Sequence, residues 1–216
     1  MKRRIANRYG VPSVVSVSGW GLSVKIIFLS ILSVLFSAVC FAGDIEPVFE
    51  ALKSSAVNYE PDGAVCEQVA RLRLQEDYPD KDFLLATGIE YSTGGQTLGE
   101  LDLVVINRTT QKVVLVMEVK CWKNYGQALD KAKAQRDRFT WNLTKYPHQI
   151  RFTTYSDLHL RPEQFEGNAT VFRSLSHAGG IRHGFDMELG FTLSELRDLR
   201  MKLLKCQAWG GCPRPE

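Results

Sequence analysis

The stretch LGELDLVVINRTTQKVVLVMEVKCW, residues 98–122, constrains the fold more than any other part of the chain. It contains two apolar runs of strand length, joined by a polar turn, and near the turn both runs are apolar on both faces. Such a pattern is typical of central strands that are covered on both sides. It predicts two strands, at about 99–106 and 112–121, in the middle of a sheet.

Ionisable residues interrupt these two strands at the ends that lie far from the turn. Because strand side chains alternate between the faces of a sheet, Glu100 and Asp102 share a face of the first strand, and Glu118 and Lys120 share a face of the second. A turn centred on residues 109–110 pairs Glu100 with Glu118 and places Asp102 diagonal to Glu118. All four side chains then meet on one face of the sheet.

Three carboxylates on one face repel each other, and a single lysine does not balance them. A hard divalent cation does, since Mg²⁺ is commonly held by one or two carboxylates and keeps several waters that can be activated for attack on a phosphate. A neighbouring lysine can stabilise the charge that develops in that reaction. The pattern therefore predicts a metal site, and the alternative is a set of solvated salt bridges at strand ends.

The residues GELD at 99–102 and EVK at 118–120 resemble the PD-(D/E)xK nuclease superfamily, especially its restriction-endonuclease-like and Holliday-junction-resolvase-like members. The resemblance covers residues 64–155. It implies an α/β fold with a restriction-endonuclease-like core, in which helices flank a central mixed sheet in the order αβββαβ. The Pro-Asp pair that names the superfamily is replaced here by Leu101-Asp102.

The resemblance also implies roles for individual residues. Asp102 and Glu118 would bind Mg²⁺, for which Mn²⁺ could substitute, and Lys120 would be the catalytic lysine. Glu67, on the helix before the sheet, would complete the metal site; its alternative interpretation is a solvated helix position. Glu100 matches an acidic residue whose role varies within the superfamily.

The helix predicted at 125–143 carries two candidates for substrate binding, Gln135 and Lys131, because several branches of the superfamily use a Gln or Lys on this helix. The implied activity is metal-dependent hydrolysis of phosphodiester bonds, with nucleic acid as partner and DNA as the expected substrate. The alternative is a catalytically inactive nuclease-fold protein that acts as a nucleic-acid-binding or interaction module. The oligomeric state stays open.

Periodicity predicts the remaining elements. His177 and His183 flank a glycine-containing segment and are expected to be surface-loop residues without a role. The expected elements are helices at 44–59, 64–78 and 192–206, strands at 83–91, 149–156 and 169–175, and a glycine-containing loop at 92–99.

Residues 1–42 resemble an export signal, because basic residues precede an uncharged apolar run at 26–42 that ends in small residues before Gly43. Cleavage after Ala42 is the favoured interpretation, and it implies an exported periplasmic or secreted protein without stable membrane association. The alternative is an inner-membrane anchor, since the run is at the short end of the roughly 17–25 residues that span a bilayer. Residues 43–216 are predicted to form a single domain.

The export segment also accounts for the net charge of +3 of the whole chain. It holds five of the 27 Lys and Arg residues and none of the 24 Asp and Glu residues, so 22 basic and 24 acidic residues remain and their net charge is −2. Binding of nucleic acid must therefore depend on a local basic patch.

The four cysteines after residue 42 form an even set in a chain that is expected to reach an oxidising compartment. The predicted disulfides are Cys206–Cys212, which is local, and Cys66–Cys121, which is long-range. The alternative is four separate thiols. Their spacing does not match a zinc site.

Overall fold

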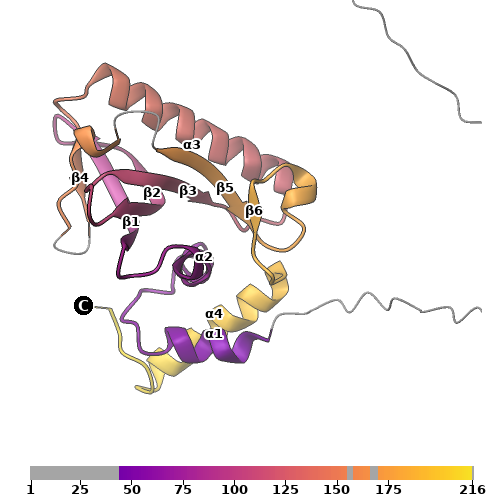
Figure 1. Cartoon of the computed structure of the whole chain (residues 1–216). Helices are drawn as coiled ribbons and strands as arrows, with labels where there is room; N and C mark the ends of the chain where they lie inside the picture. The colour runs from indigo at the N-terminus through magenta and orange to yellow at the C-terminus, as the bar shows by residue number, and fades with distance from the viewer. Residues whose placement is uncertain (1–43, 155–157, 166–169, 216) are drawn as a thin grey trace, which may run out of the picture. The chain divides into compact units, whose positions relative to one another are not determined.

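A six-stranded sheet forms the centre of the fold, with helices on both of its faces (Figure 1). The computed structural model describes residues 44–154, 158–165 and 170–215, all of which belong to one compact unit. The predicted α/β class with a mixed sheet between helices is confirmed. The export signal predicted at 1–42 lies outside the described residues.

The sheet is mixed and open, in the order β4-β1-β2-β3-β5-β6. The pairs β1–β2, β1–β4 and β2–β3 are antiparallel, whereas β3–β5 and β5–β6 are parallel. Because parallel neighbours need a crossover connection, the chain passes through α3 between β3 and β5. The strands are β1 (Phe83–Thr93), β2 (Gln96–Asn107), β3 (Val113–Val119), β4 (Arg151–Thr153), β5 (Val171–Ser176) and β6 (Met187–Glu188).

Side-chain caps begin three of the helices. The Asp44 carboxylate accepts the Glu46 amide at 3.0 Å, and the Asn124 side chain accepts the Gln127 amide at 3.1 Å. Thr192 forms a capping box with Glu195. The helices are α1 (Ile45–Leu52), α2 (Ala64–Asp77), α3 (Tyr125–Lys145) and α4 (Leu193–Ala208), with short 3₁₀ helices η1 (Pro162–Phe165) and η2 (Ile181–His183).

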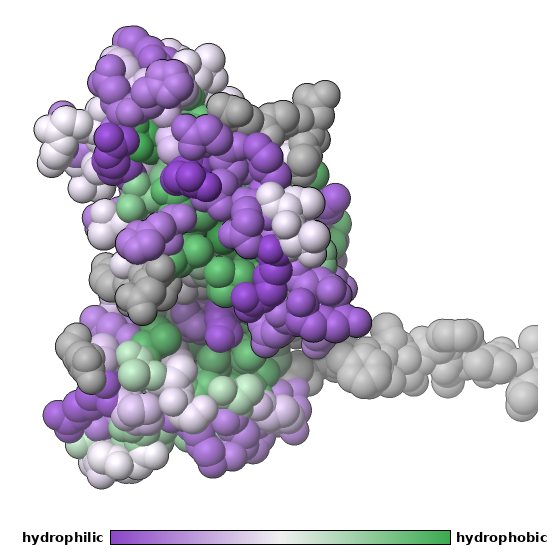
Figure 2. Space-filling model, turned by 60° about the vertical axis from the view of Figure 1, so that its left-hand side comes forward, coloured by the Kyte–Doolittle hydropathy of each residue, from purple (hydrophilic) through white to green (hydrophobic). Residues whose placement is uncertain are grey.

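Alternation along β2 and β3 divides the apolar residues between two cores. Leu103 and Met117 point into the core shared with α1, α2 and α4, whereas Val104 and Val116 point into the core under α3. Figure 1 shows α3 on one side of the sheet and the other three α-helices on the opposite side. On the face drawn in Figure 2, polar residues form most of the outer surface and hydrophobic residues are visible between them.

The register between β2 and β3 differs from the predicted register by two residues. Val104 lies opposite Val116, so continuing the ladder places Asp102 opposite Glu118, where the sequence predicted Glu100. A bulge after Val105 shifts the pairing. The predicted parity is correct, which is why the acidic side chains still share one face.

The glycine-containing segment predicted as a loop at 92–99 is mostly strand. Gly94 and Gly95 have φ angles of 55° and 80° and make a two-residue hairpin turn between β1 and β2. Two consecutive positive φ values are typical of hairpin turns whose twist matches that of the strands. The first helix is shorter than predicted, since α1 ends at Leu52 and not near residue 59.

The strand beside β3 is also not the one that follows the helix directly in the sequence. The strand predicted at 149–156 is reduced to β4, an edge strand of three residues that pairs with β1. The short strand predicted at 169–175 is β5, and it returns parallel to β3. The order αβββαβ is thus present in the chain, but its last strand lies at the far edge of the sheet.

Both predicted disulfides are present. Cys66 and Cys121 are bonded with a Cα–Cα distance of 6.4 Å, and Cys206 and Cys212 with a distance of 5.2 Å. The alternative of four separate thiols is therefore wrong. In the described ranges, no helix is both long and apolar enough to span a bilayer.

Candidate functional site

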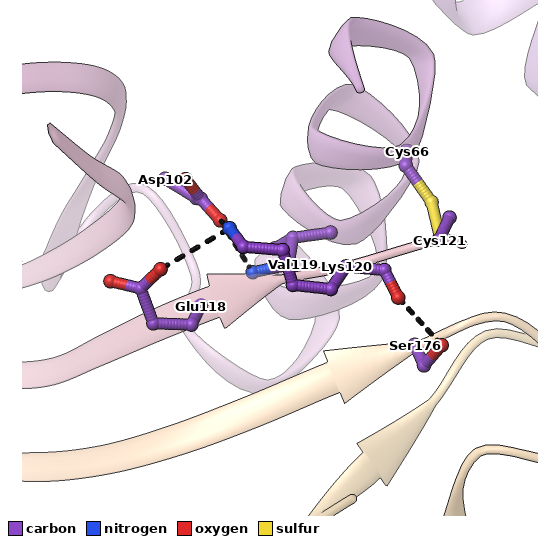
Figure 3. Close-up of polar contacts among 7 residues, drawn as sticks. All are labelled: Cys66, Asp102, Glu118, Val119, Lys120, Cys121 and Ser176. Carbon is purple, nitrogen blue, oxygen red and sulfur yellow. Dashed lines mark hydrogen bonds and ion pairs between the residues drawn. A yellow bond between two sulfur atoms is a disulfide. The ribbon is translucent and has the colours of Figure 1, made fainter. Parts of the chain in front are cut away.

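Lys120 lies between two carboxylates just beyond the end of β3 (Figure 3). Its ammonium group donates to Asp102 Oδ2 on β2 and, at 3.3 Å, to Glu118 Oε2 on β3. The exposed fractions of Asp102, Glu118 and Lys120 are only 6%, 3% and 8%. Burial disfavours the ammonium form, but Asp102 and Glu118 outweigh it and raise the pKa of Lys120, so the lysine is charged at neutral pH.

Asp102 also closes the β2–β3 ladder. Its Oδ2 accepts the backbone amide of Val119 at 2.7 Å, in addition to the ammonium group of Lys120. The Asp102 side chain thus fixes the end of β3 against β2. This contact places the lysine next to both carboxylates.

Glu118 has one oxygen that no hydrogen bond satisfies. Its Oε2 accepts from Lys120, whereas its buried Oε1 has no hydrogen-bond partner. Burial, followed by the charge of Asp102, raises the pKa of Glu118 well above its usual value, although Lys120 opposes the shift. A buried carboxylate oxygen without a donor is costly, so the arrangement favours an additional cation or donor at this point.

Glu67 approaches the same carboxylates from α2, as its electrostatics show. Burial, and then the charges of Asp102 and Glu100, raise the pKa of Glu67 to about 7. The disulfide between Cys66 and Cys121 joins the residue before Glu67 to the residue after Lys120 (Figure 3). This bond fixes α2 beside the end of β3.

Glu100 lies at the margin of the group. It is exposed on β2 and pairs across the ladder with Glu90 on β1. Burial, and then Asp102 and Glu90, raise the pKa of Glu100. The ammonium group of Lys120 makes its ion pairs with Asp102 and Glu118 and not with Glu100.

The residues at this end of the sheet have the chemistry of a site for a hard cation, but their carboxylates do not converge on one point. The described residues contain no group of three or more His, Cys, Asp or Glu side chains placed to hold a metal ion. In the present arrangement, the Lys120 ammonium occupies the space between Asp102 and Glu118. The oxygen without a partner, Glu118 Oε1, fits Mg²⁺, because this ion prefers carboxylate ligands.

The two candidates for substrate binding lie on α3, four residues apart. Lys131 is exposed to solvent. Gln135 is half-buried, and its Oε1 is, like Glu118 Oε1, a buried atom without a hydrogen-bond partner. Their role in binding substrate stays a prediction.

The sequence did not predict a basic cleft between α3 and β5. Its lining includes Glu118 together with Lys133, Arg136 and Arg173. Lys133 and Arg136 are three residues apart on α3 and thus lie on one helix face, a spacing that is visible in the sequence. Only the fold, however, brings Arg173 of β5 to the same cleft.

The prediction that His177 is a surface-loop residue is wrong. His177 is buried and stacks on Tyr125 at 4.5 Å between ring centroids, and Tyr125 stacks on His183 at 4.3 Å. The neighbouring Ser176 donates its hydroxyl to the Lys120 carbonyl at 2.7 Å (Figure 3). Residues 176–183 therefore support the segment that follows β3.

No family profile matches the chain, and neither a curated protein nor a solved structure is significantly similar to it. The resemblance to PD-(D/E)xK nucleases therefore depends on the motif residues alone.

Proposed function

We propose that this protein is a metal-dependent nuclease that hydrolyses phosphodiester bonds, with DNA as the expected substrate. One observation carries the proposal: a buried ammonium group lies between the carboxylates of two adjacent central strands, and one carboxylate oxygen beside it has no partner. Glu118 and Lys120 come from β3 and the turn after it, and Asp102 comes from β2. All three residues belong to the GELD and EVK motifs, which supports the proposal.

Stability alone does not account for this arrangement. Removing charges from water costs several kcal/mol per ion, and an apolar replacement of a buried ion pair is often neutral or stabilising. Positions with strongly shifted pKa values concentrate at functional sites. The shifted pKa values of Glu118, Glu67 and Lys120 at one end of the sheet therefore support an active site.

The chemistry follows from the groups present. Asp102 and Glu118 would hold Mg²⁺, with Glu67 as a third ligand, and the ion would supply a Lewis acid and an acidified water. Lys120 is held by two carboxylates and so presents a fixed positive charge. In hydrolysis, water oxygen bonds to phosphorus, the bond to one sugar oxygen breaks, and that oxygen takes a proton. Lys120 can stabilise the negative charge that builds up on the phosphate oxygens.

We also propose that the protein acts outside the cytoplasm. The two disulfides support this location, because disulfides persist in oxidising compartments. The export signal in residues 1–42 points the same way, with an inner-membrane-anchored form as the alternative. Degradation or processing of extracellular nucleic acid would suit such a location.

Cleavage of nucleic acid by the purified protein tests the proposal. Supercoiled plasmid, linear duplex, single-stranded DNA and RNA are incubated with Mg²⁺, Mn²⁺ or EDTA. We expect cleavage that requires the metal and falls by about a hundredfold to a thousandfold in Lys120→Met and Asp102→Asn, since loss of one electrostatic group costs roughly 10²–10³ in rate. Comparison of plasmid with linear DNA separates endonuclease from exonuclease action.

Two controls make the result interpretable. Lys205→Met changes an exposed lysine on α4 and should leave cleavage unchanged. Circular dichroism and thermal melts show whether Asp102→Asn still folds, because this residue also holds the Val119 amide. A folded parent protein that cleaves none of these substrates would refute the proposal. If it then still bound DNA, the alternative of an inactive binding module would replace it.

A further inference from the structure

We propose that the cleft between α3 and β5 binds a phosphate group of the nucleic-acid backbone next to the bond that is cleaved. The cleft has a volume of about 110 Å³. On this measure a single water needs about 10–15 Å³, so the cleft has room for a group of phosphate size. The inference rests on the proposed function, because it extends the same site.

The position of the cleft follows from the sheet register. Glu118 on β3 lies beside Ser174 on β5, and both residues line the cleft. On the other side, Glu118 accepts from the ammonium group of Lys120 at 3.3 Å. Glu118 therefore separates the cleft from the lysine, and a strand that crossed the site would bring a neighbouring phosphate to the cleft.

The cationic residues of the cleft are largely unpaired, whereas its acidic residues are engaged. Asp186 accepts from the amide and the hydroxyl of Ser174 at 2.7 and 2.8 Å, and Glu118 pairs with Lys120. Of the three basic residues, only Arg136 has an ion pair, with Asp137 on the surface. Within the described part of the chain, neither Lys133 nor Arg173 has one. Asp186 keeps its negative charge, but the three basic residues outnumber the two acidic residues of the cleft, so a net positive charge is left to bind an anion.

The residues of β5 that line the cleft lie outside the β5–β6 ladder. β6 pairs with β5 only at Leu175 and Ser176, so the ladder stops before Arg173. Lys133, Arg136 and Arg173 are all exposed. A backbone phosphate can thus be bound by surface cations without a rearrangement of the core.

The basic cleft also explains how a chain with a net negative charge could bind nucleic acid. The residues after position 42 carry a net charge of −2, which does not favour general attraction to DNA. A few unpaired cations beside the reacting group supply a local attraction. Such contacts position the backbone and carry no sequence information.

The test measures binding without cleavage. Anisotropy of a fluorescein-labelled duplex is followed against NaCl concentration in EDTA, for the parent, Lys133→Gln, Arg173→Gln and the double variant. Each lost phosphate contact should reduce the slope of log K against log salt by about 0.9, so the double variant should lose nearly two units. We expect roughly threefold to tenfold weaker binding per change, uniform across duplex sequences. Lys205→Gln on α4 is the matched control and should behave like the parent.

Cleavage kinetics separate this inference from the proposed function. In Mg²⁺, the cleft variants should raise KM by a similar factor and leave kcat within about twofold, since these residues bind substrate equally in the ground and transition states. A parent that binds duplex but does not cleave it refutes the nuclease and leaves the cleft supported if the salt slopes fall. Unchanged slopes and KM in both variants, or a parent that binds no nucleic acid, overturn the cleft.

The last measurement is the rise in melting temperature that inorganic phosphate causes. The cleft predicts that DNA binding and phosphate protection weaken together in Arg173→Gln and Lys133→Gln. If only the protection by phosphate were lost, the cleft would be a site for a free anion and the inference for nucleic acid would be wrong.

Discussion

At the two ends of the β2–β3 ladder, the side chains on one face of the sheet are similarly buried, yet they differ completely in chemistry. Near the turn, Val104, Ile106, Val113 and Val116 are all nearly inaccessible and pack in the core under α3. At the other end, the same face carries a buried ion triad. Apolar packing stabilises the first end, whereas the burial of charges at the second end offsets part of that stability.

The charged end has a covalent bond where the apolar end has packing. Cys66–Cys121 ties α2 to the residue after Lys120. The charge of Asp102 on β2 opposes that of Glu67 on α2, and the disulfide holds α2 beside the end of β3. The comparison teaches that a buried group of charges is held together by more than its own ion pairs.

The largest effect is expected when the cation is removed from the charged end. Lys120→Met removes the cation between Asp102 and Glu118, leaving Asp102 with the Val119 amide, and should lower the free energy of unfolding by about 3–5 kcal/mol at pH 8. Because burial raises the pKa of Glu118 and this side chain takes up a proton more readily in the folded state, the loss should shrink at pH 5. Urea unfolding at both pH values measures it, with Lys205→Met as control. An equal loss at both pH values would contradict this explanation.

The next largest effect is expected when each disulfide is removed in turn. The chain-entropy relation gives a loss of about 4 kcal/mol for Cys66→Ser/Cys121→Ser, which closes a loop of 55 residues. The same relation gives about 2 kcal/mol for Cys206→Ser/Cys212→Ser, which closes a loop of 6. Urea unfolding of both double variants under identical conditions gives the difference. An equal loss of unfolding free energy in the short-loop variant would show that the bond at the charged end has no special role.

A cavity at the apolar end should cost less than loss of the lysine and should not depend on pH. Ile106→Ala removes a nearly inaccessible side chain from the core under α3, with an expected loss of about 3 kcal/mol. No titratable group responds to this change, so the loss should be the same at pH 5 and pH 8. Urea unfolding at these two values tests it, and a pH-dependent loss would show that the two ends are not independent.

The smallest effect is a gain in stability when Glu67 is replaced by Gln. Its pKa in the folded protein is about 7, above its usual value of 4.5, so the folded state binds more protons between these values. The unfolding free energy therefore falls as pH rises through this window, and the cost is complete above pH 7. Glu67→Gln removes the cost and should stabilise the metal-free protein by on the order of 1–2 kcal/mol at pH 8, and not at pH 4.

Asp198→Asn serves as the control for Glu67→Gln, since it neutralises an exposed acid on α4. Thermal melts in EDTA at pH 4 and pH 8 measure both variants. If Glu67→Gln destabilised the protein at pH 8, the carboxylate would be favourably bound and the electrostatic account of the charged end would be wrong.

Much of the candidate site follows from the order of residues. The alternation of side chains predicted that Asp102, Glu118 and Lys120 share a face, and this holds although the register is displaced by two residues. A displacement by an even number keeps every side chain on its face. The bulge after Val105 depends on how strands and turn fit together, and periodicity does not report it.

Other features depend on contacts between distant segments. The sequence placed His177 in a surface loop, because its burial comes from stacking on Tyr125 of α3. It likewise assigned the last core strand to 149–156, since a short strand at an edge and one beside β3 have similar local patterns. Their positions are decided by which of them pairs with β3.

By itself, the sequence determined the alternation of the central strands, the carboxylates and lysine at their ends, the helices that flank them and the pairing of the cysteines. These features depend on local spacing and on residue chemistry. Only the tertiary structure decided that Asp102 faces Glu118, that Glu118 Oε1 has no partner and that Arg173 joins Lys133 at one cleft. The physical reason is that these contacts join segments far apart in the chain, and their geometry is set by packing of the whole sheet.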